Sequence, residues 1–203
     1  MFKRVVSDTV ETTDVGSVIK PGDYDKVDSG DYVMHEDDEK IYFLIKSKTD
    51  EYCFTNKAMI HIDGATSSNQ KRLLKRLDYK SNQLREIRLE TINTFEMEIE
   101  INVTVGKHSY SIDVNKKHIE ELKDLYKALT MISSIQDENA KLFQLAQNSL
   151  ETAATTVNSS FGSSNIADQF KAVNEYAFYW IKEAHDTYIR KDFSEVFEKL
   201  IKN

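Results

Sequence analysis

The sequence contains very few residues that cross-link or interrupt a chain. Its 203 residues include one cysteine, one proline and six glycines. The lone Cys53 excludes an internal disulfide and fits a reducing compartment, so we expect a cytoplasmic protein. No stretch approaches the roughly 18 apolar residues of a membrane span. The first residues include Lys3 and Arg4 but no apolar run behind them, so we expect no secretory signal there.

Positive charge is also in the minority. The chain has 27 lysines and arginines against 34 aspartates and glutamates, which gives a formal net charge of −7. Nucleic-acid-binding domains usually present a basic face, so the charge balance argues against nucleic acid as a partner. Charged residues make up 30% of the chain and hydrophobic residues 40%. That composition is typical of a globular protein rather than a disordered one.

Motifs that carry catalysis or hold cofactors are missing as well. The sequence has no G-x-S-x-G, no P-loop and no G-x-G-x-x-G. None of the five histidines belongs to an i, i+4 pair, so the usual metal-ligand spacing is absent. His35 begins the acidic run 35–39, which we interpret as a solvated loop rather than a cation site. We therefore expect no catalytic residues, no cofactor and no metal.

The residues that are present divide the chain into three zones. Residues 1–39 are polar and acidic without clear periodicity, which predicts an irregular or weakly helical lead-in. Residues 40–134 contain short strand-like stretches and then a helical pattern at 115–134. Residues 135–203 continue with helical patterns. The seven predicted strands are 41–45, 51–54, 59–62, 72–79, 83–92, 95–103 and 110–114.

The third zone predicts two long helices joined by a short loop. Their apolar patterns run roughly over 137–158 and 165–190, so each helix would be about 30 to 40 Å long and the two would lie antiparallel. The second helix has aromatic residues around much of its circumference, so it must bury more than one face. We favour self-association through this hairpin. The alternative is that the remaining apolar face of the second helix packs on the β-domain of the same chain. The residues expected at the interface between copies are Leu142, Leu150, Phe170, Val173, Tyr176, Trp180 and Tyr188.

One basic stretch stands out against the acidic background. Residues 71–88 contain seven lysines and arginines against two acidic residues, a net charge of +5. Such a stretch can bind phosphate or an anionic membrane surface. The alternative is a solvated sheet face whose charges pair with the acidic residues 23–39. The candidate anion-binding residues are Arg72, Arg76, Arg85 and Arg88.

Several short motifs carry a family resemblance. They are the turn 54–56 (Phe-Thr-Asn), the apolar strand 59–63 that ends in aspartate, the element 79–81 (Tyr-Lys-Ser) and the Glu-Thr pair 90–91. With these motifs the chain resembles the bacterial pleckstrin-homology (PH) domain family, in members that carry a C-terminal helical oligomerisation extension. The resemblance covers about 28–134 for the domain and 137–203 for the extension. The sequence departs from the family pattern in turns, at 57–59 and 77–78.

The resemblance implies an α+β fold, in which a seven-stranded antiparallel PH-like β-barrel is capped by a helix and followed by an α-helical hairpin. It also implies homo-oligomers, rings among them, and no established enzymatic activity or ligand. The basic loop with which eukaryotic members of the superfold bind phosphoinositides is not recognisable at 46–50. We expect a non-enzymatic binding or scaffold module that multimerises through its hairpin. Its further partner would be a protein segment at a strand edge or in the groove between barrel and helix, and membrane binding through 71–88 is the alternative.

Overall fold

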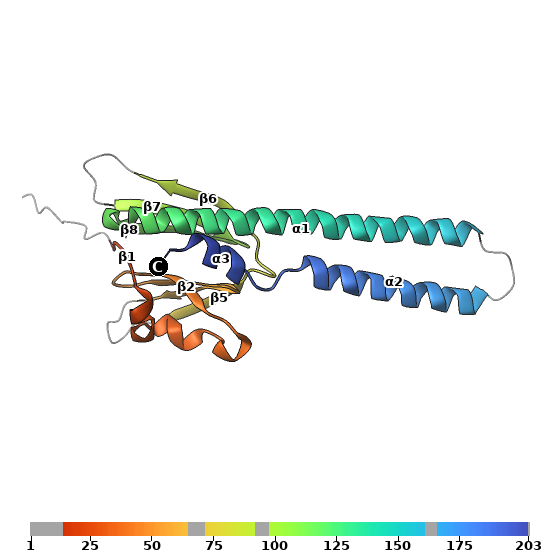
Figure 1. Ribbon diagram of the computed structural model, residues 1–203, viewed down its shortest axis with the longest axis horizontal. Helices are drawn as coiled ribbons and strands as arrows, with labels where there is room; N and C mark the ends of the chain where they lie inside the picture. Colours follow the sequence, from red (N-terminus) through yellow and green to blue (C-terminus); the bar gives the residue numbers. More distant parts are fainter. Residues whose placement is uncertain (1–13, 65–71, 92–97, 161–165, 203) are drawn as a thin grey trace, which may run out of the picture.

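Two antiparallel sheets and three α-helices make up most of the part of the chain that the structure describes. The computed structural model describes residues 14–64, 72–91, 98–160 and 166–202 (Figure 1). The first sheet has the order β1-β2-β3-β4-β5 and the second the order β6-β7-β8. The strands of the first sheet are β1 (Ser17–Val18), β2 (Ile41–Lys46), β3 (Glu51–Thr55), β4 (Ala58–Asp63) and β5 (Leu73–Asp78). Those of the second are β6 (Leu84–Glu90), β7 (Glu98–Val105) and β8 (His108–Asn115).

The expected closed barrel of seven strands is wrong in two respects. The described residues form eight strands, because the short β1 adds an edge to β2, and they form two separate sheets. No ladder joins β5 to β6. Instead, the backbone of Leu84 on β6 bonds to helix side chains: its N–H donates to Gln136 Oε1 at 2.9 Å, and its carbonyl accepts from Ser133 Oγ at 2.7 Å. These two side chains bond the backbone N–H and C=O of Leu84, which a neighbouring strand would otherwise bond.

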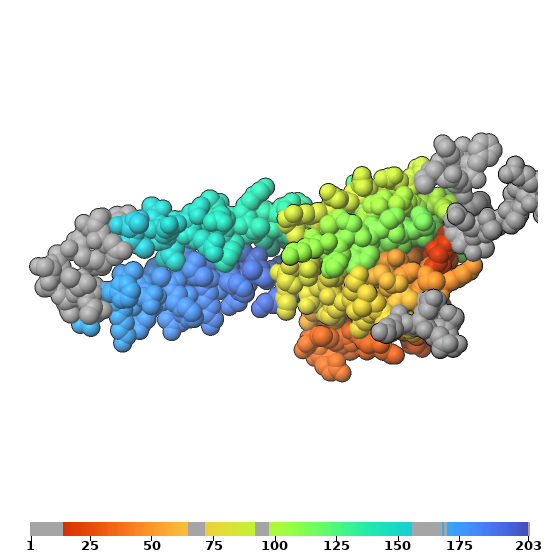
Figure 2. All heavy atoms as spheres, turned by 180° about the vertical axis from the view of Figure 1, so that it is seen from behind, coloured from red at the N-terminus to blue at the C-terminus, as the bar shows by residue number. Residues whose placement is uncertain are grey.

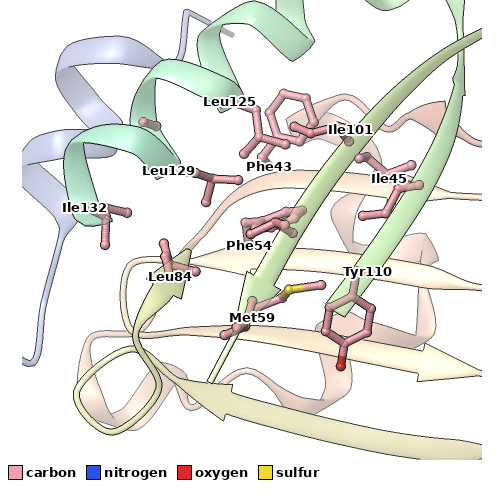
Figure 3. Packing of buried hydrophobic residues seen from close by; sticks show 14 of the residues in the cluster. Phe43, Ile45, Phe54, Met59, Leu84, Ile101, Tyr110, Leu125, Leu129 and Ile132 are labelled. Carbon is pink, nitrogen blue, oxygen red and sulfur yellow. The ribbon is translucent and has the colours of Figure 1, made fainter. Parts of the chain in front are cut away.

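Helix α1 (Ile119–Ser160) fills the space between the sheets. The inward residues of β7 alternate along the strand, as the sequence pattern predicts, and are fully buried. They meet Leu125, Leu129 and Ile132 of α1, and Phe43 and Phe54 contribute from the first sheet (Figure 3). The core therefore lies between two sheets and one helix, and α1 is a structural wall rather than an appendage.

Helix α1 is also longer than expected. The sequence predicted a capping helix at 115–134 and a new helix from 137, but a single helix of 42 residues runs through both. The stretch 119–160 contains no proline or glycine to end it. The residues at the expected break, Ser133 and Gln136, point toward the Leu84 backbone instead of opening a turn. The predicted domain boundary at 134/135 therefore lies within α1.

Beyond the sheets, α1 continues into a long projection. Helix α2 (Ile166–Tyr188) runs back beside the distal part of α1 (Figures 1 and 2). Trp180 Nε1 lies 3.4 Å from the carbonyl oxygen of Ala146, and the rings of Phe143 and His185 are 6.2 Å apart. We call α1 from residue 139 onward, together with α2, the arm. The two sheets, the first part of α1 and the segments packed on them are the body.

The chain returns to the body after α2. The short helix α3 (Ser194–Leu200) buries Val196 and Phe197 in the main core, and Phe193 just before it is also fully buried. The Phe193 N–H donates to the Asn56 carbonyl at 2.8 Å, and Asn56 Nδ2 donates to Asp192 Oδ2 at 2.6 Å. The last residues of the chain thus complete the body, although in sequence they follow the arm.

The lead-in packs on the opposite face of the first sheet. Residues 20–38 form three short 3-10 helices, η1 (Pro21–Lys26), η2 (Asp28–Tyr32) and η3 (His35–Asp37). A second apolar cluster lies beneath them, formed by Val27, Val33, Leu44, Cys53 and Ile60. The weakly helical zone of the sequence is thus a cover for the sheet, and it explains why β2 to β4 are apolar on both faces. Residues 1–13 of that zone lie outside the described residues.

We predict that Phe197→Ala destabilises the body strongly. Removal of a fully buried phenylalanine leaves a cavity and costs about 3 to 5 kcal/mol. Chemical denaturation monitored by circular dichroism measures the loss. Lys199→Ala, an exposed change in the same helix, is the control and should shift the free energy of unfolding by less than about 0.5 kcal/mol. Equal effects of the two changes would show that α3 does not belong to the core.

Candidate interaction surfaces

The arm has an inner face that its two helices share. Phe143, Ala146 and Leu150 of α1 are half-buried, and so are Val173 and Ala177 of α2. Nearer the body, Ala184 is buried. These positions recur every three or four residues, which is the spacing of one helix face. One stripe on each helix is therefore used for packing within the arm.

A second set of large apolar side chains on the arm has no such cover. The rings of Phe178 and Tyr179 lie 5.8 Å apart in an edge arrangement, and those of Tyr176 and Trp180 stack at 6.5 Å. The two pairs lie on different sides of α2, because Tyr176 and Phe178 are separated by about 200° around the helix. Soluble monomers seldom expose this many large apolar residues, and exposed apolar surface of this kind marks interaction sites. The exposed fractions are 62% for Leu145, 68% for Phe170, 66% for Tyr176, 66% for Phe178 and 65% for Tyr179. We call these five residues the arm patch.

The seven residues expected between copies divide into two groups. Leu142, Phe170, Tyr176 and Trp180 are exposed, so they are available to a partner. Leu150, Val173 and Tyr188 are half-buried. The expected set omitted Leu145, Phe178 and Tyr179, which are all more exposed than Trp180. The aromatic run 176–180 was the signal for two of them.

The basic stretch is distributed over both sheets. Arg72 forms an ion pair with Asp28 of η2. Arg76 donates to both carboxylate oxygens of Glu39, at 3.0 and 3.1 Å, and to Asp78 at 2.9 Å. Both arginines thus pair with acidic residues of the lead-in, which is the pairing that the sequence offered as the alternative to anion binding.

Arg85 and Arg88 lie elsewhere, on β6 of the second sheet. Arg85 donates to Gln83 Oε1 from its Nε at 3.0 Å, and Arg88 lies 3.8 Å from Glu90. Arg72 thus directly precedes β5 and Arg76 lies within it, whereas the other two arginines lie on the other sheet, so the structure does not place the four arginines on one surface. Lys71 lies outside the described residues.

Glu39 is the centre of the polar network that holds the lead-in to the sheet. Its side chain is buried, and it accepts hydrogen bonds from Arg76, from Thr55 Oγ1 and from the Met34 N–H at 2.8 Å. Burial works to raise the pKa of Glu39, but the hydrogen bonds from Arg76 and Thr55 outweigh it and hold the pKa below its usual value. The carboxylate therefore stays charged and binds three separate segments.

We predict an acid-sensitive contribution from this carboxylate. Its lowered pKa means that its stabilising effect is complete above the usual glutamate range and is lost as the pH falls through the lower folded value. Glu39→Gln removes the carboxylate that both terminal nitrogens of Arg76 bond and leaves Arg76 paired with Asp78, which should cost about 3 kcal/mol at pH 7. The difference in unfolding free energy from the unchanged protein should narrow below about pH 4.5.

Denaturation curves recorded from pH 7 to pH 3 measure this difference. The exposed Glu138→Gln is the matched control and should follow the unchanged protein at every pH. A Glu39→Gln penalty that does not change with pH would contradict the role given to the ionised carboxylate.

Two kinds of feature are absent from the described residues. Within the ranges given above, no three histidine, cysteine, aspartate or glutamate side chains are grouped so that they could hold a metal ion. No described helix combines the length and apolar character needed to cross a bilayer.

The arrangement as a whole, two antiparallel sheets with a helix packed against their open corner, is that of a PH-like fold. The sequence profile of the bacterial PH domain matches residues 9–133, and the chain belongs to that family. Residues 144–203, which form most of the arm and α3, match the YvbH-like oligomerisation region.

Two relatives match all or nearly all of the chain. A Bacillus subtilis (strain 168) protein, described as uncharacterized protein YvbH, is 46% identical over 204 residues and matches 100% of both chains. A crystal structure of a PH-domain-containing bacterial protein from Exiguobacterium sibiricum 255-15 superimposes with a TM-score of 0.85 at 43% identity, and covers 93% of this chain and 100% of that one. The body and the arm are thus found together in related proteins.

Proposed function

We propose that this protein is a non-enzymatic scaffold that self-associates through the arm patch and displays several copies of its PH-like body. One observation carries the proposal: five large apolar side chains on the arm are each more than 60% exposed. The match of residues 144–203 to an oligomerisation region supports the same assignment.

The body offers the arm patch no place to pack. Its core is already closed by α1 and α3, and α2 lies beyond the sheets rather than on them (Figure 1). Burial of a large apolar side chain contributes about 2 kcal/mol relative to exposure. A contact that buries two or three such residues from each copy supplies on the order of 10 kcal/mol, which is comparable to the cost of bringing two molecules together. A second copy is the partner that this surface fits.

Self-association would give the bodies a collective property. Copies joined through their arms project their bodies outward, since body and arm lie at opposite ends of α1 (Figure 1). A partner with repeated sites then binds the second body at a high effective concentration, so weak single contacts become useful. The sequence contains no G-x-S-x-G, P-loop or G-x-G-x-x-G motif. This supports display rather than catalysis as the role.

We predict that Phe178→Glu combined with Tyr179→Glu converts the oligomer to a monomer. Four charges in a pairwise contact cannot be buried without partners, so the interface should fail while the body stays folded. Multi-angle light scattering measures the mass, and circular dichroism confirms the fold. The control places two glutamates on the body portion of α1, Thr130→Glu with Ser134→Glu, at positions that are also exposed.

The control should keep the mass of the unchanged protein. A full-length chain that is monomeric at all concentrations, or a Phe178/Tyr179 variant with unchanged mass, would contradict the proposal. Truncation before the arm is a poorer test, because it also removes Phe193 and Phe197 from the core of the body.

A further inference from the structure

We propose a second interaction site on the body: a groove between β6 and α1 that takes a short, extended, acidic segment of another protein as an added strand. The site deepens the display role, because it names the surface that each body would present. It depends on residues of the body only, so it is testable whether or not the arms associate.

The backbone of β6 is free to bond along part of its outer edge. Leu84 pairs with Val105 and Leu89 with Ile101, and these partners on β7 are four residues apart, so Leu84 and Leu89 have the same orientation in the ladder. The N–H and C=O of Leu84 point outward, to Gln136 and Ser133. The N–H and C=O of Leu89 therefore also point outward. None of the hydrogen bonds among the described residues satisfies them there.

A groove lies beside this open edge. It has a volume of about 670 Å³ and runs between the end of β6 and the first turns of α1. Ile87 and Leu89 are half-buried and pack against the core, and Tyr126 of α1 forms the opposite apolar wall. In strand addition, backbone hydrogen bonds hold the segment and alternate side chains enter such a groove.

The rim of the groove sets the charge of the partner. Its charged lining residues are Arg88, Lys123 and Lys127 against Glu90 alone, which makes a basic site on a chain of net charge −7. Lys123 and Lys127 form i, i+3 pairs with Glu120 at 2.7 Å and Asp124 at 2.8 Å. The Lys123–Glu120 pair is exposed on both sides, and pairs of this kind contribute little to stability, so Lys123 can take a new carboxylate as its partner. An acidic segment is the partner that fits.

The open edge is too short and too charged to suit pairing between two copies. Four of the seven β6 residues are charged, a register shift separates Arg85 from Arg88, and Glu86 has a φ of 48°. Charges and bulges on edge strands prevent sheets from joining edge to edge. The edge is open only from Ile87 to Glu90, so a segment of about four residues fits it and a second β6 strand does not.

The test is selection of peptides from a random heptapeptide library displayed on phage, with the full-length protein as bait. We expect enriched sequences in which apolar and acidic residues alternate. The synthetic peptide of the most enriched sequence should bind Tyr126→Ala, and separately Lys123→Glu with Lys127→Glu, at least tenfold more weakly than the unchanged protein. Arg72→Glu, on the other sheet, is the matched control and should bind the peptide normally.

Backbone pairing is tested on the peptide side, where the fold of the protein is not at risk. Single N-methylation should abolish binding at alternate amides of the peptide and leave it intact at the amides between them. In the complex, amide hydrogen exchange at Leu89 should slow at least tenfold. Absence of any enriched sequence, binding that ignores the groove substitutions, or equal effects of N-methylation at all amides would overturn the proposal. Light scattering on the same samples shows separately whether the arms associate.

Discussion

The packing of one helix into the corner between two sheets determines most of this structure. β5 and β6 do not pair, so the corner would expose the core if α1 did not fill it with Leu125, Leu129 and Ile132. The backbone of Leu84 is satisfied by Ser133 and Gln136 of the same helix. Because the helix is rigid through that contact, its direction beyond residue 136 is fixed, and with it the direction of the arm.

The return of the chain links the arm to the body a second time. Residues after α2 dock on the β3–β4 turn through Asn56 and insert Phe193 and Phe197 into the core. The arm is thus held at both of its ends. An arm fixed in this way loses little conformational entropy when copies associate, which lowers the cost of forming an oligomer. The same arrangement leaves the outer half of β6 open beside α1, so the two surfaces stay independent.

Local patterns in the sequence predicted most of the strands and the helical zones. They did not predict how the two sheets and α1 pack together. Alternation identified the strands, as at Ile99 to Val105, and the acidic lead-in was correctly offered as a partner for Arg72 and Arg76. The predicted closed barrel was wrong because β6 does not pair with β5. The backbone N–H and C=O of Leu84 bond to side chains of α1 instead, and no periodicity in the sequence reveals this. The break near residue 134 was wrong because polar side chains there bond to another strand. The aromatic surplus of 176–180 was visible in the sequence, but which side chains remain exposed is a property of the packing.

Burial of the arm patch between copies is the feature on which the proposed function depends. The fluorescence of Trp180, the single tryptophan of the chain, reports on this burial. Its ring stacks on that of Tyr176, a residue of the arm patch, at 6.5 Å, and it is 39% exposed in one chain. The measurement is acrylamide quenching of its fluorescence over a dilution series, with the mass followed by light scattering. We expect strong protection of Trp180 in the oligomer and several-fold greater quenching once dilution yields monomers. Quenching that stays constant while the mass falls would contradict it, because the copies would then be joined elsewhere.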